Sequence, residues 1–142
     1  MIEVRFYEAV EDDLLKFSVI LSWSQGKWVF CKHRERDTYE VPGGHREAGE
    51  DILETAKREL YEETGAVDFD IEKLCVYSVV RDGNVAEESF GMLYFAQIRE
   101  FEGELHSEIE KTILTDEPVE AWTYPEIQPK LMEEYERRMG IR

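Results

Sequence analysis

Three glutamates, Glu59, Glu62 and Glu63, have side chains and a spacing that could do chemistry. Residues three and four apart are neighbours on a helix surface, so the three carboxylates should converge. Their repulsion costs about 0.2–0.5 kcal/mol per pair, and anions near a helix C-terminus oppose its dipole by about 0.3–1 kcal/mol each. A hard divalent cation such as Mg²⁺, which prefers oxygen ligands, would offset this cost. A solvated acidic helix face would have the same spacing, so spacing alone leaves both interpretations open.

A helix must position these carboxylates, and the sequence predicts one over residues 52–64. Asp51 followed by Glu54 is a capping-box-like start, and Gly65 is a natural stop. We expect an apolar stripe to pack on a sheet and to leave the glutamates at the edge of the buried interface. The predicted stripe comprises Leu53, Ala56, Leu60 and Thr64.

Eight residues in and around this helix follow one spacing pattern, which begins before the helix and ends just after it. They are Gly44, Glu50, Arg58, Glu59, Leu60, Glu62, Glu63 and Gly65. This pattern resembles the Nudix box, G-x5-E-x7-R-E-U-x-E-E-x-G-U, where U is a bulky aliphatic residue. Only the last position departs from it, because Ala66 is small. The motif is highly specific, far more so than a short glycine-rich pattern.

The resemblance implies the Nudix fold, an α+β (α/β/α) arrangement in which a mixed β-sheet is sandwiched between α-helices. It implies a hydrolase that cleaves a nucleoside diphosphate linked to another group, with Mg²⁺ or Mn²⁺ as cofactor. Carried over by position, the metal ligands are Gly43, through its carbonyl, with Glu59, Glu62 and Glu63.

The resemblance also implies roles for the neighbouring charged residues. Arg58 would orient a catalytic glutamate, and Glu50 would hold the loop or assist as a base. Either Glu59 or Glu62 would be the general base. A further metal ligand often comes from a downstream acidic loop, and the candidates here are Asp116, Glu117, Glu108 and Glu110.

Substrate choice rests on elimination, since the signatures of the ADP-ribose, dinucleoside polyphosphate and NADH branches are absent. This favours a MutT-like pyrophosphohydrolase that converts a (d)NTP, or an oxidised one such as 8-oxo-dGTP, to a monophosphate and pyrophosphate. Alternatives are an RNA 5′-pyrophosphohydrolase and a non-enzymatic nucleotide-binding module. An isomerase of a related branch would need a catalytic cysteine, but Cys31 and Cys75 lie in apolar strand patterns.

Other side chains could bind the substrate. Candidates for phosphate contacts are Arg34, Arg36, Arg46 and Arg81, and candidates for stacking on a base are Phe90, Tyr94 and Trp122. The histidines, His33, His45 and His106, show no metal-ligand spacing, and only His45 lies beside the box.

The remaining elements predict a sheet and a closing helix. Strands are expected at residues 17–23 and 27–33, which form a hairpin, and at 38–44, 69–82, 89–100 and 119–124. A helical pattern follows over residues 125–138, with one apolar face formed by Ile127, Leu131, Met132 and Tyr135.

Length and composition bound the class of protein. The chain has 142 residues, which predicts a single domain over 1–142, and a formal net charge of -16. Such a charge disfavours nucleic acid, apart from an RNA 5′ end, and favours a small nucleotide substrate. The two cysteines predict free thiols of a reducing compartment, and the sequence shows no signal peptide or membrane span. We therefore expect a cytoplasmic protein that is a monomer or a homodimer.

Overall fold

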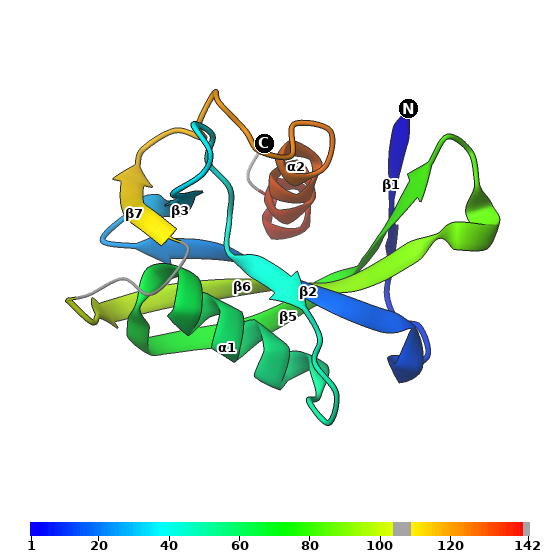
Figure 1. Ribbon diagram of the computed structural model, residues 1–142, viewed down its shortest axis with the longest axis horizontal. Helices are drawn as coiled ribbons and strands as arrows, with labels where there is room; N and C mark the ends of the chain where they lie inside the picture. Colours follow the sequence, from blue (N-terminus) through cyan, green and yellow to red (C-terminus); the bar gives the residue numbers. More distant parts are fainter. Residues whose placement is uncertain (104–108, 141–142) are drawn as a thin grey trace.

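The computed structural model describes residues 1–103 and 109–140. One mixed sheet lies between two helices, α1 (Ile52–Thr64) and α2 (Gln128–Met139) (Figure 1). The strands are β1 (Ile2–Tyr7), β2 (Leu15–Ser24), β3 (Lys27–His33), β4 (Gly43–His45), β5 (Ala66–Arg81), β6 (Ser89–Phe101) and β7 (Ile109–Thr115). Short 3-10 turns occur at Asp12–Leu14 and Val85–Glu87. The predicted mixed sheet between helices is confirmed.

Along one edge of β2 the neighbouring strand changes from β3 to β4, and this change positions the candidate site. The strand order is β1-β5-β6-β2-β3-β7, with β2 and β6 parallel and the other neighbours antiparallel. The strand β3 pairs with β2 only near the hairpin turn, over Ser22–Ser24. Beyond that point β4 replaces it, and Gly43 lies opposite Val19. Gly43 and Gly44 therefore lie in a strand of the sheet rather than in a loop.

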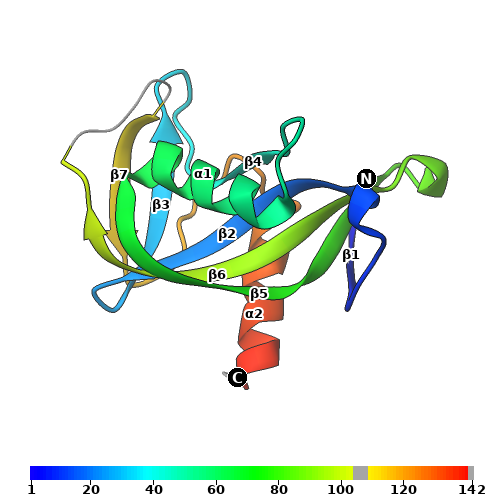
Figure 2. The same cartoon turned by 90° about the horizontal axis from the view of Figure 1, so that it is seen from below.

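Each face of the sheet carries its own hydrophobic cluster, because side chains alternate along a strand. On the α1 face, Ile20 packs with Ala56 and Leu60, and all three are fully buried. On the α2 face, Phe30 packs with Leu131. Figure 2 shows the two helices on opposite sides of the sheet. The predicted apolar face of α2 is confirmed, since Ile127, Leu131, Met132 and Tyr135 all belong to this second cluster.

Helix α1 has the predicted bounds and caps. Asp51 accepts from the backbone of Glu54, whose side chain accepts in return, and Gly65 closes the helix at φ 78°. The predicted core stripe was wrong at Leu53, which is 38% exposed, while Ile52 is buried. The buried face runs through positions 52, 56 and 63, so that Leu53 falls at its margin.

Several strand predictions were wrong because sheet partners decide strand extents. Residues 119–124 form no strand and make only an isolated bridge between Trp122 and Tyr39. In the predicted strand 38–44, only bridges occur before β4, which begins at Gly43. Strands β1 and β7 were not predicted.

The cysteines fit the expectation from the sequence. Cys31 and Cys75 are both free and buried. Within the residues that the structure describes, no helix is long and apolar enough to cross a membrane.

Candidate active site

Arg58 is the centre of the charged network on α1. Its Nε and Nη2 atoms donate to the two carboxylate oxygens of Glu50 at 2.6 and 3.1 Å, a bidentate arrangement. Its Nη1 atom donates to Glu59 at 3.0 Å and to Glu62 at 3.1 Å. Its Nη2 atom also reaches the backbone carbonyl of His45 at 3.0 Å. One guanidinium thus fixes three of the box glutamates relative to β4.

Glu50 serves the loop that precedes α1. It accepts from the Thr55 hydroxyl at 2.7 Å and from the backbone N–H of Glu47 at 3.1 Å. The hydrogen bond from Arg58, followed by that from Thr55, lowers the pKa of Glu50 to about 2. A carboxylate this acidic is a poor proton acceptor, so the geometry favours the loop-holding role over that of a base.

Glu63 is a buried carboxylate in the last turn of α1, with only 8% of its surface exposed. Its Oε1 atom accepts from the backbone N–H of Gly43 at 2.8 Å. Burial, opposed by the Gly43 hydrogen bond and reinforced by the nearby carboxylates of Glu59 and Glu40, raises the pKa of Glu63 to about 8. The N–H and C=O of one strand residue point to the same edge, so the Gly43 carbonyl also faces α1.

Glu59 is half-buried against the other glycine of β4. A Cβ atom built on Gly44 would overlap the Glu59 carboxylate, so a side chain at this position would force that carboxylate to move. Burial raises the pKa of Glu59, although Arg58 opposes the shift. Glu62, by contrast, is exposed. The structure therefore brings Gly43, Glu59, Glu62 and Glu63 to one place, where α1 meets β4.

This donor set fits a hard divalent cation. Carboxylate and carbonyl oxygens are the ligands that Mg²⁺ and Mn²⁺ prefer, and a cation would stabilise the ionised form of the buried Glu63 carboxyl group. The residues that would hold the cation are Gly43, Glu59, Glu62 and Glu63.

Two residues that the sequence did not single out adjoin this set. The Nε2 atom of His33 lies 3.3 Å from Glu63 Oε2 and 3.5 Å from Glu40 Oε2. The emphasis on His45 was therefore incomplete, because His33 is the histidine among the carboxylates. No local signal could have found this contact, since His33 ends β3 and Glu63 lies thirty positions later in α1, with β4 between them.

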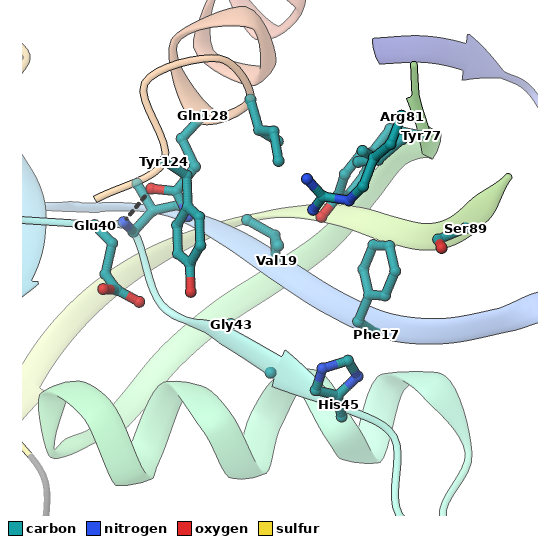
Figure 3. Close-up of a pocket in the computed structure, with 14 residues that line it drawn as sticks. Phe17, Val19, Glu40, Gly43, His45, Tyr77, Arg81, Ser89, Tyr124 and Gln128 are labelled. Carbon is teal, nitrogen blue, oxygen red and sulfur yellow. Dashed lines mark hydrogen bonds between the residues drawn. The ribbon is translucent and has the colours of Figure 1, made fainter. Parts of the chain in front are cut away.

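A cavity of about 300 Å³ opens on the other side of β4, towards α2. Figure 3 shows Phe17 and Val19 of β2, Tyr77 and Arg81 of β5, and Tyr124 before α2 around this space. Gly43, Gly44 and His45 line it as well, so the cavity and the carboxylates meet at β4. Three aromatic rings and one guanidinium there could contact a nucleoside.

The predicted substrate-binding side chains do not lie together in the structure. Arg81 lines the cavity, whereas Phe90 and Tyr94 belong to the cluster beneath α1. Trp122 packs edge-on against Phe30, with ring centroids 5.4 Å apart. The stacking candidates in the cavity are therefore Phe17, Tyr77 and Tyr124 rather than the three aromatics predicted.

The other predicted arginines make local contacts. Arg46 donates to Asp12 at 3.0 Å and to the Glu50 carbonyl at 2.8 Å. Arg36 donates to Glu40 at 2.8 Å. Arg34 directly follows β3.

The three downstream acidic candidates that the structure describes, Asp116, Glu117 and Glu110, do not gather at the box. Asp116 pairs with Lys27, at the opposite end of β3 from His33, and the exposed Glu117 directly follows it. Glu110 pairs with Lys32. Glu108 and His106 lie outside the described residues.

Comparisons with known proteins agree with this architecture. A family model described as "NUDIX domain" matches residues 14–139. The protein named "Putative 8-oxo-dGTP diphosphatase YtkD" of Bacillus subtilis (strain 168) is 33% identical over 101 residues. The match covers 71% of this chain and 61% of that protein, so the chain spans less than two thirds of that relative's length.

Solved structures share the fold. The crystal structure of the Bacillus subtilis pyrophosphohydrolase BsRppH superposes with a TM-score of 0.79 at 24% identity, over 99% of this chain and 93% of that one. A UDP-X diphosphatase superposes with a TM-score of 0.73 at 18% identity, over 90% of this chain and 64% of that one. At these identities the likeness establishes the fold alone.

Proposed function

The chain belongs to the Nudix family of hydrolases, and we propose that it is a divalent-cation-dependent pyrophosphohydrolase of nucleoside triphosphates. Its substrate is a (d)NTP or an oxidised (d)NTP, and its products are the nucleoside monophosphate and pyrophosphate. The name of the relative YtkD supports the oxidised nucleotide as the first substrate to test.

The observation that carries this proposal is the shared strand β4. Gly43 and Gly44 face the glutamates of α1 on one side and line the cavity on the other. A glycine has no side chain to keep a phosphate from the backbone. The phosphates therefore lie along the two glycines, and the nucleoside occupies the cavity.

The cavity provides contacts for a base. Phe17 packs on Tyr77 with ring centroids 5.4 Å apart, and Tyr124 lines the same space. The guanidinium of Arg81 points into the cavity (Figure 3). Aromatic faces stack on a purine or a pyrimidine, and a guanidinium donates to its carbonyl oxygens or to the sugar.

The residues of α1 divide the chemical work. A divalent cation, when bound, neutralises phosphate charge and increases the acidity of the attacking water. The water attacks a phosphorus atom, the P–O anhydride bond breaks, and the carboxylate of Glu59 takes the proton. Glu59 suits this role better than Glu62, because its half-buried site raises its pKa whereas Glu62 is exposed. Arg58 keeps Glu59 in place.

Turnover with Mg²⁺ across a substrate panel tests the proposal. The panel contains the standard (d)NTPs, 8-oxo-dGTP, ADP-ribose, NADH, diadenosine polyphosphates and 5′-triphosphorylated RNA, with products resolved by chromatography. We expect release of pyrophosphate from one class of (d)NTP, and its loss with EDTA or in Glu62→Gln. Glu54→Gln is the matched control, since Glu54 is an exposed glutamate of the same helix that only caps it.

Other results would redirect the assignment. Metal binding without turnover of any compound would favour a nucleotide-binding module, and exclusive cleavage of RNA would favour a 5′-pyrophosphohydrolase. The net charge of -16 argues for the small substrate over RNA. An isomerase has no support, because burial raises the pKa of both thiols, that of Cys75 to about 11.

A further inference from the structure

A second group of possible ligands lies beside the box. His33 at the end of β3, Glu40 before β4 and Glu63 in α1 each offer one ligand atom, and these atoms all lie within 4.8 Å of one another. We name these three residues the histidine cluster. It shares only Glu63 with the box donors, and it includes a nitrogen ligand that the box lacks.

The histidine cluster gathers two buried carboxyl groups around one imidazole. Glu40 is 5% exposed and Glu63 is similarly buried, and one imidazole faces both carboxylates. Arg36 contacts the Oε1 atom of Glu40, which leaves the Oε2 atom directed at His33. The field of Glu63 and Glu40 adds to burial in raising the pKa of the nearby Cys31 thiol. A bound cation would stabilise the ionised forms of these buried carboxyl groups.

The distances within the histidine cluster suit metal ligation better than direct hydrogen bonding. The separations from His33 Nε2 are 3.3 Å to Glu63 Oε2 and 3.5 Å to Glu40 Oε2. Charge-assisted N–H···O bonds are shorter, about 2.7–2.9 Å. Tetrahedral ligands with bonds of about 2.0–2.1 Å to one metal lie roughly 3.3–3.4 Å apart. The two separations from His33 therefore match those between ligands of one ion, and all three ligand atoms lie within 4.8 Å of one another.

We propose that His33, Glu40 and Glu63 form a second cation site that selects a transition-metal dication of the Zn²⁺ and Co²⁺ class over Mg²⁺. The imidazole nitrogen provides this selectivity, because Mg²⁺ favours oxygen ligands whereas Co²⁺ and Zn²⁺ bind imidazole well. Three protein ligands leave a fourth position open. Glu40 lines the cavity, as Gly43 and Gly44 do, so the second cation site adjoins the cavity.

This site goes beyond the proposed function and requires no turnover. A cation held by the oxygen ligands of the box and one held by His33 would share Glu63, so the two sites can be told apart only by their metal preference. The probe must therefore bind while an excess of Mg²⁺ occupies the oxygen ligands.

Titration of the metal-free full chain with Co²⁺ in a large excess of Mg²⁺ tests the proposal. Four-coordinate Co²⁺ has an intense visible absorption band, and six-coordinate Co²⁺ a weak one. We expect the intense band to saturate at one equivalent. Changes around a metal ligand cost about 10–100-fold in affinity, so His33→Gln and Glu40→Gln should each lose at least about tenfold. The matched control is His45→Gln, which removes the other described histidine and should bind as the parent does.

Three results would overturn the site. They are the absence of an intense band in the parent protein, parental Co²⁺ affinity in both His33→Gln and Glu40→Gln, and an equal loss in His45→Gln. Circular dichroism and melting temperature establish that each variant is folded. If one cluster variant does not fold, the other decides, because the two residues come from different elements.

Discussion

The two helices each carry a buried glutamate in their C-terminal half, but only the glutamate of α2 is paired with arginines. In α2, Glu134 accepts from Arg137 at 3.0 Å and from Arg138 at 2.7 Å, and the hydrogen bond from Arg137 lowers its pKa. In α1, no basic residue occupies the last turn, and burial raises the pKa of Glu63 to about 8.

This difference sets α2, whose buried carboxylate is satisfied within the helix, apart from α1, to which we assign the cation site. Arginines in the last turn of α2 satisfy both the helix dipole and the buried carboxylate. In α1, Arg58 donates to Glu59 and Glu62, whereas Glu63 accepts from the backbone amide of Gly43 in β4. A local rule broken in one helix and obeyed in the other is the mark of a functional site.

The largest expected effect is a loss of kcat. Glu62→Gln should leave the fold intact and lower kcat with Mg²⁺ by about 10²–10⁴-fold, because it removes a carboxylate from the cation site. Glu134→Gln should keep the parental kcat, since Glu134 lies on α2 and does not line the cavity. Steady-state kinetics on the preferred nucleotide measures both. Near-parental activity of Glu62→Gln would refute the metal role.

Removing a buried leucine should destabilise the protein by a similar amount in either helix. Leu60 of α1 and Leu131 of α2 are both fully buried, so Leu60→Ala and Leu131→Ala should each cost about 2–5 kcal/mol of unfolding free energy. Leu53→Ala, at the exposed margin of α1, should cost about 0.5 kcal/mol or less. Chemical denaturation gives these values. If Leu60→Ala melted like the parent, the assigned core face of α1 would be misplaced.

The pH dependence of stability should have opposite signs for the two buried glutamates. The folded pKa of Glu63, about 8, lies above the ordinary 4.5, so the folded state binds more protons and its contribution falls as pH rises from 4.5 to 8. The folded pKa of Glu134 lies below 4.5, so its contribution is present above pH 4.5 and is lost as pH falls.

Melting curves of metal-free protein between pH 4 and 9 check this contrast. Glu63→Gln should flatten the loss of stability on the alkaline side, and Glu134→Gln should reduce the loss on the acidic side. An unchanged alkaline slope in Glu63→Gln would show that Glu63 does not hold its proton in the folded state.

The smallest effect should be on metal-free stability at neutral pH. Glu62→Gln removes repulsion and an unfavourable dipole interaction, together about 0.5–1.5 kcal/mol, and loses one exposed pair with Arg58 worth about 0.3–0.5 kcal/mol. A slight rise in melting temperature should result. Glu134→Gln should lower it, because both arginine contacts are weakened. A drop in both variants would remove the distinction between the helices.

The sequence by itself determined the site-bearing helix. The bounds of α1, its capping box and its glycine stop follow from interactions between residues at most four apart. The spacing of Glu59, Glu62 and Glu63 on one stripe is equally local, and so is the apolar face of α2. The family pattern from Gly44 to Gly65 then identified the fold and the metal-ligand candidates before any tertiary contact was known.

Only the tertiary structure decided what surrounds that helix. Strand β4 exists because β2 offers a free edge where β3 departs, and Leu53 is exposed because the sheet selects which stripe is buried. His33 and Glu40 lie close to Glu63 although they are far from it in the chain. The cavity between β4 and α2 likewise brings together elements that are distant in the sequence. Such contacts follow from how the sheet is assembled, and no local spacing encodes them because strand pairing and packing are set by distant partners.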